Sequence, residues 1–307
     1  MLRHKCQKSE SGMNERDTMK ITRKAYAKIN LGLDVTGRRA DGYHMVRMIM
    51  QNVDLYDTLT FEESAEKGIR LYTSSPSIPA DEHNLIWKVC ALLMDKYHIE
   101  SGVTVTLEKR IPVAAGMAGG STDGAAAFMG MNELFALGLS GQEMCEMAVK
   151  LGADIPYCIL GGTSLAEGIG EILTPLPDMP ECAIIIAKPA IGVSTKWVYT
   201  ELDSREIASH PDIDGIRDAI ARGDLQGVQK LLGNVLEPVT TARYTVITEI
   251  EQIMKAHGAL NAMMSGSGPT VFGIYTDQAA AQESYQALEK SGLCPELYLS
   301  RPINPKQ

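Results

Sequence analysis

The sequence lacks the features that identify zinc proteins, disulfide-stabilised secreted proteins and membrane proteins. Its six cysteines lie far apart, with no Cys-x-x-Cys pair and no histidine at ligand spacing. That pattern is typical of reduced, mostly buried thiols. No apolar run approaches the roughly 20 residues of a membrane helix, and the N-terminal stretch has no signal-peptide core. We therefore expect a cytoplasmic protein without a bound transition metal.

Two common nucleotide-binding motifs are also absent. No Gly-Lys dipeptide occurs anywhere, which excludes a Walker A loop, and His-Arg-Asp and Asp-Phe-Gly are missing, which excludes a protein kinase. The formal net charge of −9 argues against nucleic acid or an anionic membrane as a partner, because both repel a net acidic surface. A local basic site for an anionic small molecule is still compatible with this charge.

The chain has ordinary globular composition, and its 307 residues suffice for two domains or one large one. Strands and helices are predicted in both halves without regular alternation, which favours an α+β fold. Three prolines within 174–180 mark the best candidate boundary, so we predict domains over 19–174 and 175–307. Residues 1–18 are polar and aperiodic, and are predicted to be a disordered leader or to precede the true start at Met19.

One strand is predicted clearly by alternation. From Ala25 to Val35 every odd position is apolar and the even positions include Lys28 and Asn30. The pattern indicates a half-buried strand with these two side chains projecting together from the other face. At two residues of rise they would stand about 7 Å apart.

Helical periodicity recurs through the rest of the chain, and Ser140 with Glu143 forms a capping box for a helix that Gly152 should end. Strands are predicted at 102–112 and 182–187 and on both sides of the glycine-rich turn 265–269. Helices are predicted at 81–98, from near Ser121, after Ser194, and at 212–232, 241–257 and 278–290.

The stretch PVAAGMAGGSTDGAAA at 112–127 lies between a predicted strand and a predicted helix. A helix N-terminus has unsatisfied N–H groups and a partial positive charge. Glycines in front of it let phosphate oxygens reach those donors. Ser121, Thr122 and Asp123 add oxygen atoms that could meet a phosphate or a magnesium ion. The alternative is a strand-to-helix turn whose small residues pack against the sheet.

Five segments in order resemble the GHMP kinases, the superfamily of galactokinase, homoserine kinase and mevalonate kinase. Together they span nearly everything from Met19 onward. They are AYAKINLGLDV (25–35), DGYH (41–44), the glycine loop, GADIPY (152–157) and SGSGPT (265–270).

The resemblance implies an N-terminal α+β domain with a left-handed crossover, a C-terminal ferredoxin-like domain, and substrates between them. It implies an ATP-dependent, Mg²⁺-requiring kinase of isoprenoid precursor biosynthesis by the non-mevalonate pathway. The implied reaction is phosphorylation of the C2 hydroxyl of 4-diphosphocytidyl-2-C-methyl-D-erythritol. The implied ATP-binding residues are Pro112, Val113, Ala114, Ala115, Gly116, Met117, Ala118, Gly119, Gly120, Ser121 and Thr122.

The resemblance also implies the catalytic residues. Lys28 would hold the reacting hydroxyl with its cation, Asp154 would accept the hydroxyl proton, and Asn30 would help to position the substrate. Without the resemblance, Lys28 would be a solvent-facing strand lysine and Asp154 an ordinary turn residue.

A second group of residues is implied to bind the cytosine base. Tyr43 would stack on the ring and His44 would hydrogen-bond to it, whereas a plain hairpin loop is the alternative for both. Tyr199 corresponds to the aromatic on the other face of the ring, with Trp197 left as an alternative. Stacking is worth about 1–3 kcal/mol per base.

The glycine loop departs from the commoner family pattern. It has Met117-Ala118 where leucine-glycine is frequent, Thr122 for serine and Gly124 for alanine. We expect the methyl group of Ala118 to fit if its φ is negative and to cause strain if its φ is positive.

Two other functions compete with this interpretation. One is a GHMP kinase that acts on homoserine or a mevalonate derivative, against which the DGYH segment speaks. The other is a non-catalytic nucleotide-binding protein with the same fold, against which the presence of both Lys28 and Asp154 speaks.

Overall fold

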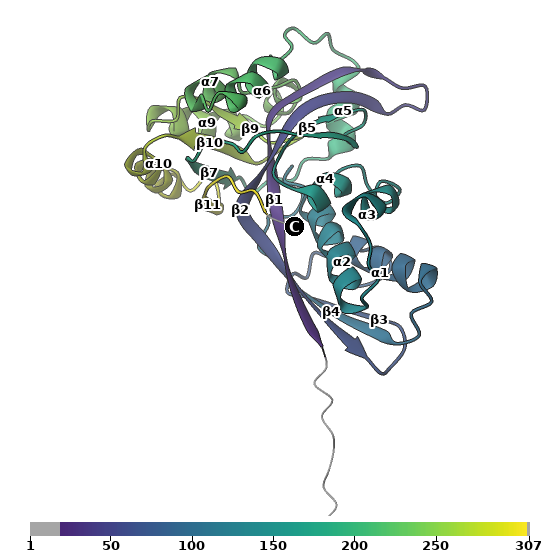
Figure 1. Ribbon diagram of the computed structural model, residues 1–307. Coiled ribbons are helices and arrows are strands. Elements are labelled where there is room, and N and C mark those ends of the chain that lie inside the picture. Colours follow the sequence, from purple (N-terminus) through teal and green to yellow (C-terminus); the bar gives the residue numbers. More distant parts are fainter. Residues whose placement is uncertain (1–18, 306–307) are drawn as a thin grey trace, which may run out of the picture.

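The computed structural model describes residues 19–305, which form two β-sheets with helices packed against them (Figure 1). The predicted disordered leader, residues 1–18, lies outside the described residues. Within the described range, none of the helices combines the length and the apolar character needed to cross a membrane.

The larger sheet is built around a long antiparallel hairpin, β1 paired with β2 (Figure 1). Its order is β3-β4-β2-β1-β8. Strand β5 pairs with the first part of β2, and β6 pairs with β5. The parallel neighbours β3 and β4 are connected through a helix. The strands are β1 (Lys20–Arg38), β2 (His44–Ser64), β3 (Ile69–Thr73), β4 (Gly102–Glu108), β5 (Thr163–Glu167), β6 (Ile172–Pro175) and β8 (Gly233–Asn234).

Four helices accompany this sheet: α1 (Leu85–Lys96), α2 (Gly119–Leu134), α3 (Gly141–Ala148) and α4 (Ile155–Leu160). The alanine run of α2, Ala125 to Ala127, is fully buried in one core cluster with Phe61 and Val105 of the sheet. Small side chains there let the helix approach the strands closely. The packing face that the alternative reading of the glycine stretch predicted is therefore present, directly behind the loop.

The smaller sheet has the order β11-β7-β10-β9, and all its pairs are antiparallel. By position in the chain this is fourth, first, third, second, the order of a ferredoxin-like βαββαβ unit. The predicted α+β fold with a ferredoxin-like second part is confirmed. Its elements are β7 (Ala183–Lys188), α5 (Thr195–Leu202), α6 (Ile213–Ala221), α7 (Leu225–Leu231), α8 (Glu237–Thr241), α9 (Val246–Ala256), β9 (Ala262–Met264), β10 (Val271–Tyr275), α10 (Gln278–Ser291) and β11 (Glu296–Ser300).

Strand β1 is buried on both faces between Ala27 and Val35, so the predicted half-buried strand is wrong in this respect. Its odd positions are buried as predicted, and Ile29 packs in one core cluster with Ile186 and Phe272 of the smaller sheet. Its even positions are buried as well. Lys28 and Asn30 face a cavity whose walls, the glycine loop and parts of the smaller-sheet region, shield them from bulk water. Alternation could not show this second cover, since that cover comes from distant parts of the chain.

The proline-rich connection at 176–182 joins β6 to β7, and the division into domains at 174/175 stays a prediction. The hydrophobic core does not stop at this connection. Residues of β1 and β2 share core clusters with residues of the smaller sheet, as Leu33 and Met50 do with Ile185.

Several predicted helix boundaries were wrong. The helix predicted at 212–232 is two helices, because Gly223 has a φ of +68° and Asp224 caps a new helix through Gly227 N. The one predicted at 241–257 is preceded by a separate short helix. Helix α2 begins at Gly119, two residues before Ser121, so its predicted start near Ser121 is confirmed. The capping box of α3 is confirmed, but the helix ends at Ala148, before Gly152.

Candidate active site

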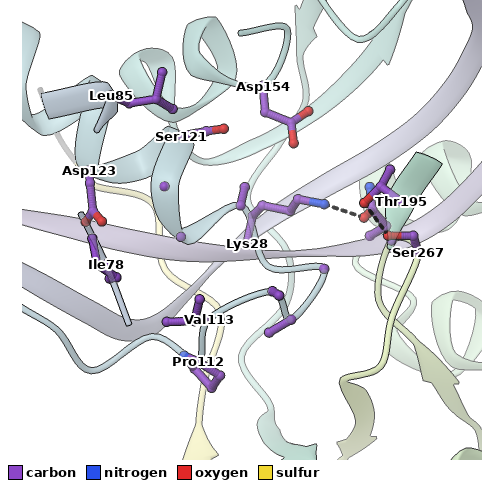
Figure 2. Close-up of a pocket in the computed structure, with 18 of the residues that line it drawn as sticks. Lys28, Ile78, Leu85, Pro112, Val113, Ser121, Asp123, Asp154, Thr195 and Ser267 are labelled. Atoms are coloured by element: carbon purple, nitrogen blue, oxygen red, sulfur yellow. Dashed lines mark hydrogen bonds between the residues drawn. The ribbon is translucent and has the colours of Figure 1, made fainter. Parts of the chain in front are cut away.

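A cavity of about 510 Å³ lies where the glycine loop, the middle of β1 and the start of α5 meet (Figure 2). Met117 and Thr122 do not line it: Met117 is in the core, and the Thr122 hydroxyl donates to Tyr26 O at 2.7 Å. Tyr43 and His44 lie outside its lining. The predicted residues that line it are Lys28, Asn30, Pro112, Val113, Ala114, Ala115, Gly116, Ala118, Gly119, Gly120, Ser121, Asp154 and Tyr199.

Gly116 is needed where the two glycine-rich loops touch. Its φ is +71°, and a Cβ there would lie 2.2 Å from Ser265 O. The Ser265 hydroxyl donates to Gly116 O at 3.0 Å. This glycine therefore serves close packing between the loop before α2 and the loop before β10.

The other two glycines of the loop differ in what surrounds them. A Cβ on Gly119 would lie 2.9 Å from Lys109 Nζ and 3.2 Å from Ile111 Cγ2. A Cβ on Gly120 would meet only Leu85 Cδ1, at 4.0 Å. Gly120 is therefore the glycine whose bare backbone borders open space in the cavity.

The loop also contains two strained alanines. Ala114 and Ala118 have φ values of +52° and +57°, in the left-handed region. For a residue with a Cβ this conformation costs roughly 1–2 kcal/mol. The strain expected for a positive φ at Ala118 is thus present, and such strain is concentrated where the surroundings fix the backbone.

Ala118 is also the N-cap of α2, and no side chain accepts a hydrogen bond from the first turn of this helix. Its first N–H groups lie beside the cavity. Together with the open space at Gly120 they form a favourable site for an anion.

Lys28 lies on β1 and is only 5% exposed, and its Nζ donates to Asn30 Oδ1 at 2.6 Å (Figure 2). Burial lowers the pKa of Lys28 from its ordinary value, and the nearby Asp154 carboxylate partly opposes this shift. Within 19–305 no ion pair joins the two groups. An ammonium and a carboxylate thus face one cavity with space between them.

Asp154 is positioned by the start of α4. It occupies the N-cap position with αR geometry, but its carboxylate makes no capping hydrogen bond. In the part of the chain that the structure describes, neither a hydrogen bond nor an ion pair occupies its oxygens. Figure 2 shows the carboxylate above the Lys28 ammonium, facing the same space. An unpaired carboxylate at this place is available to accept a proton.

A buried charge cluster missed by the sequence analysis lies at the loop's base. Lys109 Nζ bonds to the carboxylates of Asp57 and Asp123, the latter at 2.9 Å, and all three side chains are at most 6% exposed. The second oxygen of Asp123, Oδ1, has no partner. Burial raises the pKa of Asp123 well above its usual range, although Lys109 opposes this. Removing one partner from such a buried pair costs about 3–5 kcal/mol.

The smaller sheet contributes hydroxyl groups to the cavity. Thr195, at the start of α5, and Ser267, in the loop before β10, hydrogen-bond to each other at 2.8 Å and both line the cavity (Figure 2). The sequence analysis did not single out either residue, although Ser267 lies within the SGSGPT motif.

The predicted base-binding residues are only partly together. The rings of His44 and Tyr199 are in contact, with centroids 4.7 Å apart and planes tilted by 35°, and His44 Nε2 donates to Asp203 Oδ1 at 2.6 Å. Tyr43 is 60% exposed on the adjoining loop. Trp197 instead packs edge-on against Tyr244 and is not among the cavity residues. Of the two aromatic candidates, Tyr199 is the one that borders the cavity.

The oxygen donors at the cavity suit a magnesium ion held mainly by phosphates. Among residues 19–305 there is no cluster of three or more His, Cys, Asp or Glu side chains that would enclose a metal. Asp123 Oδ1 is buried and free, and Ser121 lines the cavity beside it. Mg²⁺ typically takes one or two carboxylates and completes its shell with phosphate and water, so these residues fit it.

Two family models match the chain. The one described as GHMP kinases N terminal domain covers residues 84–162, and the one described as GHMP kinases C terminal covers 216–293. The first match contains the glycine loop and Asp154, and the second contains most of the helices and strands of the smaller-sheet region.

Several named relatives resemble most of this chain. A 4-diphosphocytidyl-2-C-methyl-D-erythritol kinase from Lachnospira eligens is 52% identical over 285 residues, 93% of this chain and 99% of the relative. The kinase of the same name from Enterococcus faecalis is 48% identical over 93% of this chain and 100% of its own length.

Solved structures of kinases also match this chain. A crystal structure of 4-(cytidine 5'-diphospho)-2C-methyl-D-erythritol kinase matches with a TM-score of 0.79 and 29% identity, covering 93% of this chain and 100% of that one. Homoserine kinase from Cytophaga hutchinsonii matches with a TM-score of 0.77 but 20% identity, covering 97% and 98%, and thus shares the fold.

Proposed function

Because the chain belongs to the GHMP kinase family, we propose that it transfers a phosphoryl group from ATP to 4-diphosphocytidyl-2-C-methyl-D-erythritol. The acceptor is the C2 hydroxyl, and the products are the 2-phosphate and ADP. The relatives of 44–52% identity are named as this kinase, and the match covers nearly their whole length. The reaction belongs to the non-mevalonate route to isoprenoid precursors.

One observation carries the mechanism: Lys28 and Asp154 face a single cavity beside the uncapped N-terminus of α2. Phosphoryl transfer asks for positioning, charge neutralisation and a base for the hydroxyl proton. Asp154 has a free carboxylate for the proton, and Lys28 has a buried cation held in place by Asn30. These parts suffice for the chemistry without a covalent intermediate on the protein.

In the transfer step, the C2 hydroxyl lies between the two side chains. Its proton passes to an Asp154 carboxylate oxygen as the hydroxyl oxygen bonds to the terminal phosphorus of ATP. The bond from that phosphorus to the bridging oxygen breaks, and ADP leaves with the electron pair. Lys28 stabilises the negative charge on the attacking oxygen. General-base assistance of this kind contributes about 10²–10⁴-fold to the rate.

ATP binds along the glycine loop. The N–H groups at the start of α2 lie beside the cavity, and Gly120 leaves room for phosphate oxygens to approach them. The whole segment from Pro112 to Thr122 forms this half of the site. Met117 and Thr122 do not line the cavity but hold the loop in place, Met117 by packing in the core and Thr122 by its hydrogen bond to Tyr26 O.

Magnesium accompanies ATP in this proposal. Asp123, through its free oxygen, and Ser121 are the residues that would hold it. When bound, Mg²⁺ neutralises part of the phosphate charge.

The cytidyl group of the acceptor binds at the other end of the cavity. Tyr199 offers a ring face there, backed by the His44 ring. Burial raises the pKa of Tyr199 to about 12, so its hydroxyl keeps its proton at physiological pH. Tyr43, exposed on the neighbouring loop, can cover the base from outside.

A coupled assay of ADP release tests this function. We expect turnover with the cytidyl substrate and background rates with homoserine, mevalonate and galactose. In the same assay Asp154→Asn should lose most of its turnover. Its matched control is Asp277→Asn, because Asp277 is an N-cap aspartate whose side chain does cap its helix. Equal turnover of homoserine and the cytidyl substrate would overturn the assignment of the acceptor.

A further inference from the structure

Asp57 lies beneath the glycine loop, where no part of it reaches solvent. Its Oδ1 accepts hydrogen bonds from the N–H groups of Arg110 and Ile111, at 2.5 and 2.8 Å. These are the residues at which β4 has ended and the loop begins. The other oxygen, Oδ2, bonds to Lys109 Nζ. One carboxylate thus fixes three successive residues at the entry to the loop.

Lys109 extends this connection to the far end of the loop. Its Nζ also bonds to Asp123, the fifth residue of α2, at 2.9 Å. The chain Asp57–Lys109–Asp123 therefore joins the entry of the loop to its exit across the strained segment that contains Ala114 and Ala118.

The position of Lys109 also accounts for Gly119. A Cβ at 119 would lie 2.9 Å from Nζ. A free lysine end could move aside, but this one is held by two buried carboxylates. The glycine is therefore required by Lys109, whereas the open surroundings of Gly120 are those expected for a residue beside a ligand.

We propose that Asp57 is a positioning residue for ATP: acting through Lys109 and Asp123, it fixes the separation of the two ends of the glycine loop. This inference rests on the proposed function. Lys109 and Asp123 line the cavity while Asp57 lies behind them and cannot touch a ligand. Its effect on ATP is exerted through the loop geometry alone.

ATP binding without the second substrate is the measurement. Calorimetric titration of Asp57→Asn with a non-hydrolysable ATP analogue and Mg²⁺ should give an affinity about tenfold or more weaker than wild type. In steady-state assays the KM for ATP should rise in parallel, and the KM for the cytidyl substrate should stay within about twofold. Binding is measured without turnover, so an error in the proposed acceptor would not alter this result.

Lys188→Met is the matched control. Lys188 also forms an ion pair, with Glu296 at 2.8 Å, but this pair is only partly buried and lies in the smaller sheet, away from the cavity. The Lys188→Met variant should lower the stability of the protein and leave the KM values for both substrates unchanged. If Asp57→Asn does not fold, the double variant Asp57→Asn/Lys109→Met, which removes both opposite charges together, is measured by the same criteria.

Gly119→Ala tests the link between the glycine and the lysine. Alone it should weaken ATP binding, and in the Lys109→Met background the further loss should be much smaller, because the clash is gone. Full additivity would show that Gly119 acts independently of Lys109. ATP affinity within about twofold of wild type in folded Asp57→Asn, or equal losses for both substrates, would overturn the proposal.

Discussion

The amide oxygen of Asn30 accepts a 2.6 Å hydrogen bond from the ammonium of Lys28, two residues earlier on the same strand. The pairing of β1 with β2 shifts register just before Lys28 and again just after Asn30. Both shifts fall at the segment that borders the cavity. Because an amide carries no net charge, Asn30 orients the ammonium without neutralising it. The positive charge is left for the substrates.

Asp154→Asn is expected to lower kcat by at least ~10²-fold while both substrates still bind, because the amide keeps the shape but cannot accept the proton. Lys28→Ala should also lower kcat steeply. The double variant should lose much less than the product of the two single losses, because the residues act together. Turnover and thermal stability are measured on the same samples. Wild-type turnover in stable Asp154→Asn would remove Asp154 from the mechanism.

Activity should decline on the alkaline side at a pH below 10.5, the ordinary pKa of lysine. Burial lowers the pKa of Lys28, and the charged form is present below that pKa and lost as the pH rises through it. Asn30→Asp adds a negative charge beside the ammonium, raises its pKa and should move the decline to higher pH.

The readout is the pH profile of kcat/KM. Gln142→Glu, which adds the same charge on the exposed side of α3, is the control and should leave the profile unchanged. An unmoved alkaline decline in active Asn30→Asp would show that another group titrates there.

His44→Ala should raise the KM for the cytidyl substrate and leave the KM for ATP nearly unchanged, since it removes the ring that backs Tyr199. An aromatic pair of this kind is worth about 0.5–1.5 kcal/mol, which corresponds to roughly two- to thirteenfold in KM. Trp197→Phe is the comparison, because Trp197 does not line the cavity and should tolerate the change. A change confined to the KM for ATP would place His44 in the nucleotide half of the site.

Ala118→Gly should stabilise the protein by about 1 kcal/mol. The substitution relieves the left-handed strain at φ +57°, worth roughly 1–2 kcal/mol, against a smaller entropic cost in the unfolded chain. Thermal unfolding measures it. Ala287→Gly, at a partly exposed position in the interior of α10, should destabilise by about 0.5–1 kcal/mol instead. A lower melting temperature for Ala118→Gly would mean that its methyl group makes a favourable contact larger than the strain.

Glu251 should make stability fall as the pH rises. Burial and the neighbouring Glu237 raise its pKa to about 8, and Lys255 opposes this only in part. Between pH 4.5 and about 8 the folded state therefore holds a proton that the unfolded chain has released, and unfolding becomes easier as the pH rises.

Glu251→Gln removes this difference, so it should raise stability at pH 8.5 by at least ~1 kcal/mol and have little effect at pH 4.5. Glu249→Gln, on the exposed side of the same helix, serves as the control. Equal effects of Glu251→Gln at both pH values would show that Glu251 ionises normally in the folded protein.

What the sequence predicted well depends on local pattern. The odd face of β1, the capping box of α3, the helix after Ser194 and the loop that opens α2 each follow from residues within a few positions of one another. The break at Gly223 is also local, but a glycine within an apolar periodic stretch does not by itself decide between a tolerated residue and a helix end.

What it missed depends on pairing across the chain. Asp57 meets Lys109 only because β2 pairs with β4 in a register that sets Thr58 opposite Glu108. The two charged residues are 52 positions apart, and nothing near either one indicates the other. The contact of His44 with Asp203 spans 159 positions in the same way. Polar side chains that pair across such distances in the chain produce no periodic pattern in the sequence.

The burial of β1 on both faces bears on how substrates enter. A kinase that opened by a hinge would need a flexible connection between its halves, yet here Ile29 is packed against Ile186 and Phe272 of the opposite half. Swinging the halves apart would expose that core to water. Substrates must therefore enter the cavity from its margins, without separation of the two halves of the molecule.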